Sequence, residues 1–122
     1  MKKFLLYSAL ATLLLSNSDC SKKKSERYKG KLEVAGICMN YTISVVEGDI
    51  DASSIVDSWT DQVTNKVYEN VFKLGNPCDF PASIKKGDEF YFTIDTTKGE
   101  TCAVCMAYYP TPSKALSIKV VE

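Results

Sequence analysis

The sequence predicts an all-β fold, a single small antiparallel barrel of about five to six strands, with a small β-sandwich as the alternative. Short runs after residue 28 alternate between apolar and polar side chains, as expected where one face of each strand is buried. Turn-forming residues separate these runs, at 75–77, 86–88, 98–99 and 110–112. No run has the periodicity of a long helix.

Each alternating run predicts a strand and its buried face. The expected strands are 31–37, 41–46, 67–74, 89–95, 101–109 and a last strand around 116–120. The residues expected to face inward are Leu32, Val34, Tyr41, Ile43, Val45, Phe90, Phe92, Ile94, Leu116, Ile118 and Val120. Asn70 leaves the facing of the third strand open, and Gly36 is expected to allow a bulge or a close approach. Strands 89–95 and 101–109 are near enough in sequence to form a hairpin.

The order of these strands resembles that of a known fold family. The first two strands, 31–37 and 41–46, are followed by a meander, and this pattern resembles the OB-fold, a five-stranded Greek-key barrel. The resemblance covers residues 28–122 as a pattern of strands and includes no diagnostic motif. It implies an OB-like architecture and no particular activity.

The N-terminus has the pattern of an export signal. Lys2 and Lys3 precede an apolar run at 4–15, which is shorter than the roughly 20 residues that a transmembrane helix needs. A short polar stretch and Cys20 follow, and this arrangement resembles the lipobox of bacterial lipoproteins. The resemblance implies a signal peptide at 1–19 that is cut before Cys20, which then carries the lipid.

The resemblance places the protein in the bacterial cell envelope, lipid-anchored and facing the periplasm or the cell surface. The sequence departs from the lipobox at Asn17 and Asp19, where the family has a leucine and a small residue. The alternative is a soluble exported protein cut after Ser18. Residues 20–27 are polar and charged after the cysteine, which predicts a flexible tether, and 28–122 form the folded domain.

Charge and composition exclude several classes of function. From residue 28 onward the chain has nine Lys and thirteen Asp or Glu residues, a net charge of −4, so a nucleic-acid partner is not expected. The chain contains no histidine, which is the usual general base and the commonest metal ligand. We therefore expect no enzyme activity and no cofactor.

Four cysteines lie within the domain, at 38, 78, 102 and 105. In a small exported domain such a set predicts two disulfides, each contributing about 2–4 kcal/mol. Cys102 and Cys105 would lie in a strand, with sulfur atoms on opposite faces and Cα atoms about 10 Å apart, so they should bond to different partners. We predict the pairs Cys78–Cys102 and Cys38–Cys105, although spacing alone leaves three connectivities open.

Two other functions would use the same cysteines. Cys102 and Cys105 form a Cys-x-x-Cys pair, which is typical of thiol–disulfide redox proteins when the first cysteine begins a helix. The Cys38-Met39 and Cys105-Met106 couples combine ligands that suit Cu(I) or zinc, but methionine in a small barrel is more often part of the core. Redox chemistry and soft-metal binding therefore stand as alternatives.

The segment 48–65 is acidic and contains no basic residue. Its Asp49-x-Asp51-x-Ser53 pattern is similar to the opening of a calcium loop, but the required glycine and closing glutamate are missing. We expect a solvated acidic loop in place of a calcium site, and a segment of this length is either functional or an unrecognised strand. Trp59, the only tryptophan, is expected in the core or in a lid.

The remaining candidate site is a group of aromatic side chains. Tyr91, Tyr108 and Tyr109, together with Trp59, form a candidate ligand surface, and ordinary packing of the tyrosines at a rim of the barrel is the alternative. The sequence therefore predicts a non-catalytic binding or structural module, held at the membrane by its lipid. Its partner is expected to be an envelope protein, a glycan or a small ligand, and the oligomeric state stays open.

Overall fold

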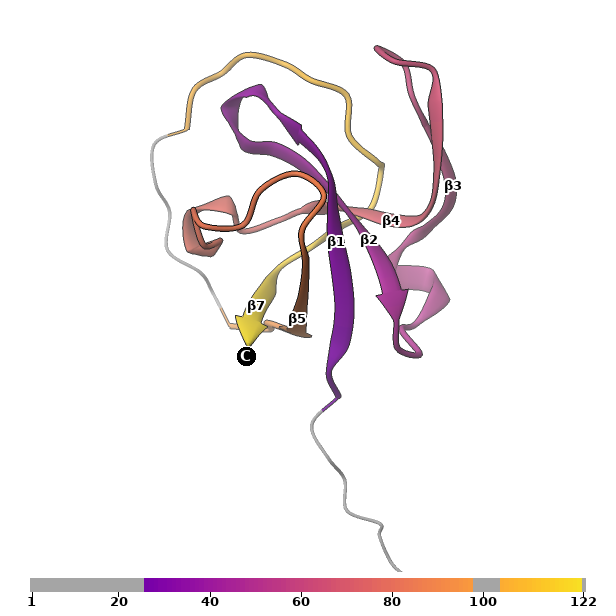
Figure 1. Cartoon of the computed structure of the whole chain (residues 1–122), viewed down its shortest axis with the longest axis vertical. Helices are drawn as coiled ribbons and strands as arrows, with labels where there is room; N and C mark the ends of the chain where they lie inside the picture. Colours follow the sequence, from indigo (N-terminus) through magenta and orange to yellow (C-terminus); the bar gives the residue numbers. More distant parts are fainter. Residues whose placement is uncertain (1–25, 98–103, 122) are drawn as a thin grey trace, which may run out of the picture.

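The computed structural model describes residues 26–97 and 104–121, and every regular element within them is a strand or a short 3-10 turn (Figure 1). The prediction of an all-β fold is confirmed. The strands are β1 (Tyr28–Gly36), β2 (Asn40–Glu47), β3 (Val56–Asp61), β4 (Lys66–Leu74), β5 (Glu89–Ile94), β6 (Ala115–Leu116) and β7 (Ile118–Val121). The 3-10 turns are η1 (Ile37–Met39), η2 (Ala52–Ser54) and η3 (Pro77–Asp79). In these two ranges no helix has the length and apolar character needed to cross a membrane.

The strands form one sheet in the order β3-β4-β2-β1-β5-β7, and β6 pairs with β4. The β4–β6 pair is parallel and the other pairs are antiparallel. The expected closed barrel is wrong, because the sheet does not close. The last segment changes partner at Ser117, so that β6 lies along β4 and β7 lies along β5.

A buried asparagine bridges this gap between β6 and β7. The Asn76 side-chain amide donates to the carbonyl oxygen of Ile118 over 2.7 Å and accepts from its N–H over 2.9 Å. A side-chain amide carries the same donor and acceptor as a peptide group, so Asn76 replaces a strand partner here. Gly75 N–H donates to the Leu116 carbonyl oxygen nearby, over 2.7 Å. The backbone groups at the gap are thus satisfied without a closed ladder.

The main core lies on one side of the sheet and contains the residues that the alternation predicts. Of the expected inward residues, those buried in this core are Leu32, Ile43, Phe90, Phe92 and Ile118. Partly buried residues pack against it, among them Tyr41, Val45, Ile94, Leu116 and Val120. The predicted faces of β2, β5 and the last strands are therefore confirmed, and in β1 the prediction holds for Leu32 but not for Val34.

A second, smaller cluster lies on the opposite face of β4. Val71 belongs to it and Phe72 belongs to the main core, because consecutive strand residues point to opposite faces. Val34 also joins the second cluster, although Leu32 does not. A register shift in the β1–β2 pairing between these two residues separates their side chains. Asn70, which left the buried face of this strand open in the sequence analysis, has a positive φ of 57°.

Two predictions about residues 101–109 are wrong within the described residues, whereas the strand alternative for the acidic segment is confirmed. The expected strand 101–109 is not a strand from residue 104 onward, and β5 pairs with β1 and β7 instead of forming a hairpin with it. The acidic segment contains β3, which forms a hairpin with β4, and Asp51 caps η2 by accepting from Ser53 N–H over 3.0 Å. The predicted turn at 98–99 lies outside the described residues.

Candidate functional site

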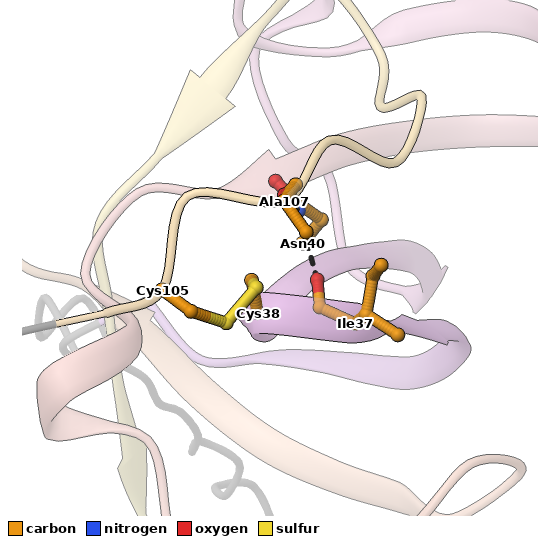
Figure 2. The surroundings of a disulfide bond; sticks show 5 residues. All are labelled: Ile37, Cys38, Asn40, Cys105 and Ala107. Carbon is orange, nitrogen blue, oxygen red and sulfur yellow. Dashed lines mark hydrogen bonds between the residues drawn. A yellow bond between two sulfur atoms is a disulfide. The ribbon is translucent and has the colours of Figure 1, made fainter.

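The residues 104–113, here called the crossing segment, have no regular structure and pass over the end of the β1–β2 hairpin (Figure 1). A disulfide between Cys38 in η1 and Cys105 joins this segment to the hairpin, with a Cα–Cα distance of 5.1 Å (Figure 2). This is one of the two pairs predicted from the sequence, where spacing alone left three connectivities open. The segment looks like a strand in sequence, but its contacts are with the tip of the hairpin.

The hairpin tip has an unusual backbone that several contacts hold in place. Cys38 and Met39 both have positive φ angles, 57° and 60°, which non-glycine residues adopt infrequently. The Asn40 side-chain amide donates to the Ile37 carbonyl oxygen over 2.8 Å and to the Ala107 carbonyl oxygen over 3.1 Å (Figure 2). One side chain therefore connects both segments close to the disulfide.

A close approach fixes the crossing segment a few residues later. A Cβ atom on Gly36 would lie 2.7 Å from the Asn40 carbonyl oxygen and 2.9 Å from the Tyr109 ring, so the ring packs where a side chain would otherwise be. The expected role of Gly36 as a point of close approach is confirmed. Pro110 and Pro112, which follow, are buried.

The Tyr109 hydroxyl connects the crossing segment to the β3–β4 hairpin. It donates to a carboxylate oxygen of Asp61 over 2.8 Å, and the other oxygen accepts from Val63 N–H over 2.8 Å. Asp61 is only 1% exposed. The hydrogen bond to Asp61, together with burial, raises the pKa of Tyr109 above its ordinary value. This carboxylate therefore has a structural role.

Apolar side chains project into solvent from both sides of the disulfide. We call this group the apolar patch: Ile37, Val104, Met106 and Tyr108. Met106 is 93% exposed and Tyr108 is 80% exposed, so the expectation that methionine fills the core is wrong for Met106. The stretches 34–46 and 104–113, which contain the patch, include no charged residue. The two segments that carry the patch are therefore uncharged, and Lys73 of β4 lines a hollow beside them together with Cys38 and Val104.

The aromatic residues predicted as one ligand surface lie in different surroundings. Trp59 and Tyr109 pack in the second cluster, where Trp59 stacks on Tyr68 with ring centroids 6.0 Å apart. Burial raises the pKa of Tyr68. Tyr108 belongs to the apolar patch. Tyr91 on β5 instead lies under the Arg27 guanidinium, whose central carbon is 4.3 Å from the centroid of the Tyr91 ring.

The state of the cysteines bears on the alternative functions. Cys78 is disulfide-bonded, and its predicted partner Cys102 and the predicted lipidation site Cys20 lie outside the described residues. The sulfur of Cys105 bonds to Cys38, so in this state it serves neither a Cys102–Cys105 redox pair nor a metal as thiolate. Among residues 26–97 and 104–121, no group of three or more metal-ligating side chains converges on one point.

Sequence reasoning identified the disulfide pair and Tyr108 but missed three residues of the site. Met106 was assigned to the core, and neither the bridging role of Asn40 nor the exposure of Ile37 was recognised. The absence of charge around both Cys38 and Cys105 was a signal that could have revealed the patch. No protein-family model, curated protein or solved structure matches this chain.

Proposed function

We propose that the protein is a non-catalytic, lipid-anchored lipoprotein of the bacterial cell envelope, whose β domain binds another molecule through a rigid surface. The observation that carries this proposal is the apolar patch beside the Cys38–Cys105 disulfide. Apolar side chains that stay in water are typical of contact surfaces when they are grouped and held in place. The lipobox-like sequence ending at Cys20 supports the anchor.

Three titratable groups with shifted pKa values take part in hydrogen bonds that hold the backbone in place. The pKa of Tyr109 is raised by its hydrogen bond to Asp61, and the pKa of Asp51 is lowered by hydrogen bonds from Ser53. The pKa of Asp95 is lowered by hydrogen bonds from the Thr97 hydroxyl and N–H. Each of these shifts arises from a bond that holds a turn or a segment in place, in contrast to the paired groups of an acid–base site.

The intact mass of the mature protein, isolated from membranes, tests this function. We expect a chain that begins at Cys20 and carries the additional mass of a lipid, with a further gain on reduction that matches two disulfides. A Cys20→Ala variant is the control and should lack the lipid mass. A mass that matches cleavage after Ser18 without lipid would contradict the anchor. Free thiols at Cys38 and Cys105 would contradict the rigid surface and favour metal binding.

A further inference from the structure

We infer that the Cys38–Cys105 disulfide is a redox switch, which a dithiol opens while the sheet stays folded. Opening frees residues 104–108 of the crossing segment and relaxes η1 at the hairpin tip. The switch needs neither the lipid anchor nor a bound molecule, so it goes beyond the proposed function. Met106 and Tyr108 lie in the freed stretch, and an effect of opening on binding would rest on that function.

The disulfide joins two segments that contribute nothing to the core (Figure 2). Residues 104–108 are all exposed, and η1 contains no buried residue. Within the part of the chain that the structure describes, a single hydrogen bond reaches this stretch from the tip, from the Asn40 amide to the Ala107 carbonyl oxygen over 3.1 Å. Segments with few buried contacts are the ones that open locally. Separating the two segments therefore costs no buried apolar surface.

The freed stretch ends at Tyr109, where contacts without cysteine begin. The Tyr109 hydroxyl is bonded to Asp61, and Pro110 and Pro112 are buried. The chain then pairs with the sheet, because β6 lies along β4. These contacts remain when the disulfide is reduced, so they limit the opening to the residues before Tyr109.

The hairpin tip has a strained backbone, which reduction helps to relax. Cys38 and Met39 are consecutive non-glycine residues in the left-handed region, with φ of 57° and 60°. The Cβ atom disfavours this conformation, so it persists where surrounding contacts impose it. Two such contacts are the disulfide on Cys38 itself and the hydrogen bond from the Asn40 amide to the Ile37 carbonyl oxygen. Reduction removes the first of them.

The redox step is a thiol–disulfide exchange with a dithiol. Cys105 is the exposed partner, and exposed disulfides are typically the labile ones. One thiolate of the dithiol attacks the Cys105 sulfur, and the S–S electron pair leaves with the Cys38 sulfur, which takes up a proton. The second thiolate then attacks the mixed disulfide, closes a disulfide within the reductant and releases Cys105, which is protonated in turn. The dithiol thus supplies two electrons and two protons, and exchange with the oxidised dithiol closes the switch again.

Graded dithiothreitol, applied without denaturant to the intact mature protein, tests the switch. Alkylation and peptide mapping locate the free thiols, and an amide NMR spectrum reports the backbone of the same samples. We expect Cys38 and Cys105 to be alkylated together, with changes in the spectrum confined to 36–40 and 104–108. The order parameters of residues 106–108 should fall below about 0.6, the range of flexible backbone. The signals of β1, β2 and β4 should keep their positions.

Two kinds of variant serve as controls. A Cys38→Ala/Cys105→Ala protein represents the open form, so its signals at 106–108 should match those of the reduced protein and should not respond to dithiothreitol. Met39→Gly tests the strain, because glycine adopts a positive φ without the cost of a Cβ. It should shift the thiol–disulfide equilibrium about fivefold toward the closed form. Ile37→Gly, in the same turn but without a positive φ, should not.

Three results would each overturn the switch: loss of the folded spectrum as soon as Cys38 and Cys105 are alkylated, a disulfide that resists dithiothreitol until denaturant is added, or order at 106–108 that is unchanged by reduction. Equal shifts for Met39→Gly and Ile37→Gly would overturn the role of the strained tip. Every readout comes from purified protein without a partner. A switch that fails therefore leaves the proposed function standing, and a missing lipid leaves the switch standing.

Discussion

The Tyr109 hydroxyl donates a 2.8 Å hydrogen bond to the carboxylate of Asp61, a residue 48 positions earlier in the chain. This bond joins the crossing segment to the β3–β4 hairpin on the face of the second cluster. The Asp61 carboxylate is buried, and this bond and the one from Val63 N–H supply its hydrogen-bond donors. The position of the crossing segment, and with it the apolar patch, therefore depends on this pair.

Tyr109→Phe should lower the melting temperature at neutral pH, because Asp61 loses a donor while it stays buried. The effect should shrink at alkaline pH. The pKa of Tyr109 is raised in the folded protein above the ordinary value of 10.0, so its stabilising contribution is complete below pH 10 and is lost as the pH rises through the folded-state pKa. Thermal unfolding followed by circular dichroism between about pH 8 and about pH 11 measures this difference.

Tyr108→Phe is the matched control, because the Tyr108 side chain is 80% exposed. It should leave the melting temperature unchanged across the same pH range. A Tyr109→Phe protein as stable as the unsubstituted protein at neutral pH would contradict the structural role of the Tyr109–Asp61 bond.

Removing the Cys38–Cys105 disulfide in a Cys38→Ala/Cys105→Ala variant should reduce the free energy of unfolding by about 4 kcal/mol. The two residues are 67 positions apart, so the bond restricts a long loop of the unfolded chain. Urea denaturation measures the loss. Val104→Ala is the control, because it changes the same segment and leaves the disulfide intact, and it should reduce the free energy of unfolding much less. An equal reduction in the two variants would show that the disulfide adds little stability.

Asn76→Ala should destabilise the domain by about 3 kcal/mol, because the buried N–H and carbonyl groups of Ile118 both lose a partner. Hydrogen exchange at the Ile118 amide should accelerate by more than the loss of global stability accounts for. Lys119→Ala, an exposed position on the same strand, is the control. Unchanged exchange at Ile118 would show that Asn76 does not replace the missing strand partner.

Gly36→Ala should destabilise the domain by about 1–3 kcal/mol, since its Cβ would lie too close to the Asn40 carbonyl oxygen and the Tyr109 ring. The Tyr109 ring would have to move, so the variant should also raise hydrogen exchange in the crossing segment. Ala35→Ser, at an exposed neighbouring position, should be neutral in the same urea titration. Equal stability of the two variants would contradict the close packing of Tyr109.

Local alternation was sufficient to predict the parts of the fold with one buried face. Leu32, Ile43 and Phe92 were placed correctly because burial on one side of a strand leaves a period of two in the sequence. β3 was not recognised, because it is an edge strand in which half of the residues are exposed and most are acidic or polar. The end of the sheet could not be predicted, because the partners of β6 and β7 and the contacts between Asn76 and Ile118 join residues that are distant in sequence.

The candidate site was predictable only in part. The cysteine count indicated disulfides, but spacing left three connectivities open and the strand expected at 101–109 does not form from residue 104 onward, so the Cys38–Cys105 pair was one choice among these. The segment after Cys105 has the composition of a strand, and the sequence does not reveal that it binds the hairpin tip through Asn40. The exposure of Met106 follows from that contact, so it was equally hidden.

The most direct measurement of the central claim is the rate of Met106 oxidation by hydrogen peroxide, compared between the purified protein and native membranes. In the free domain this side chain is 93% exposed, so it should oxidise rapidly. If the apolar patch docks on a partner, Met106 should be protected severalfold on membranes. Val46→Glu, at an exposed apolar position near the end of β2 that is remote from the tip, should keep that protection. An equal rate of Met106 oxidation in the two samples would contradict the claim that this surface is occupied.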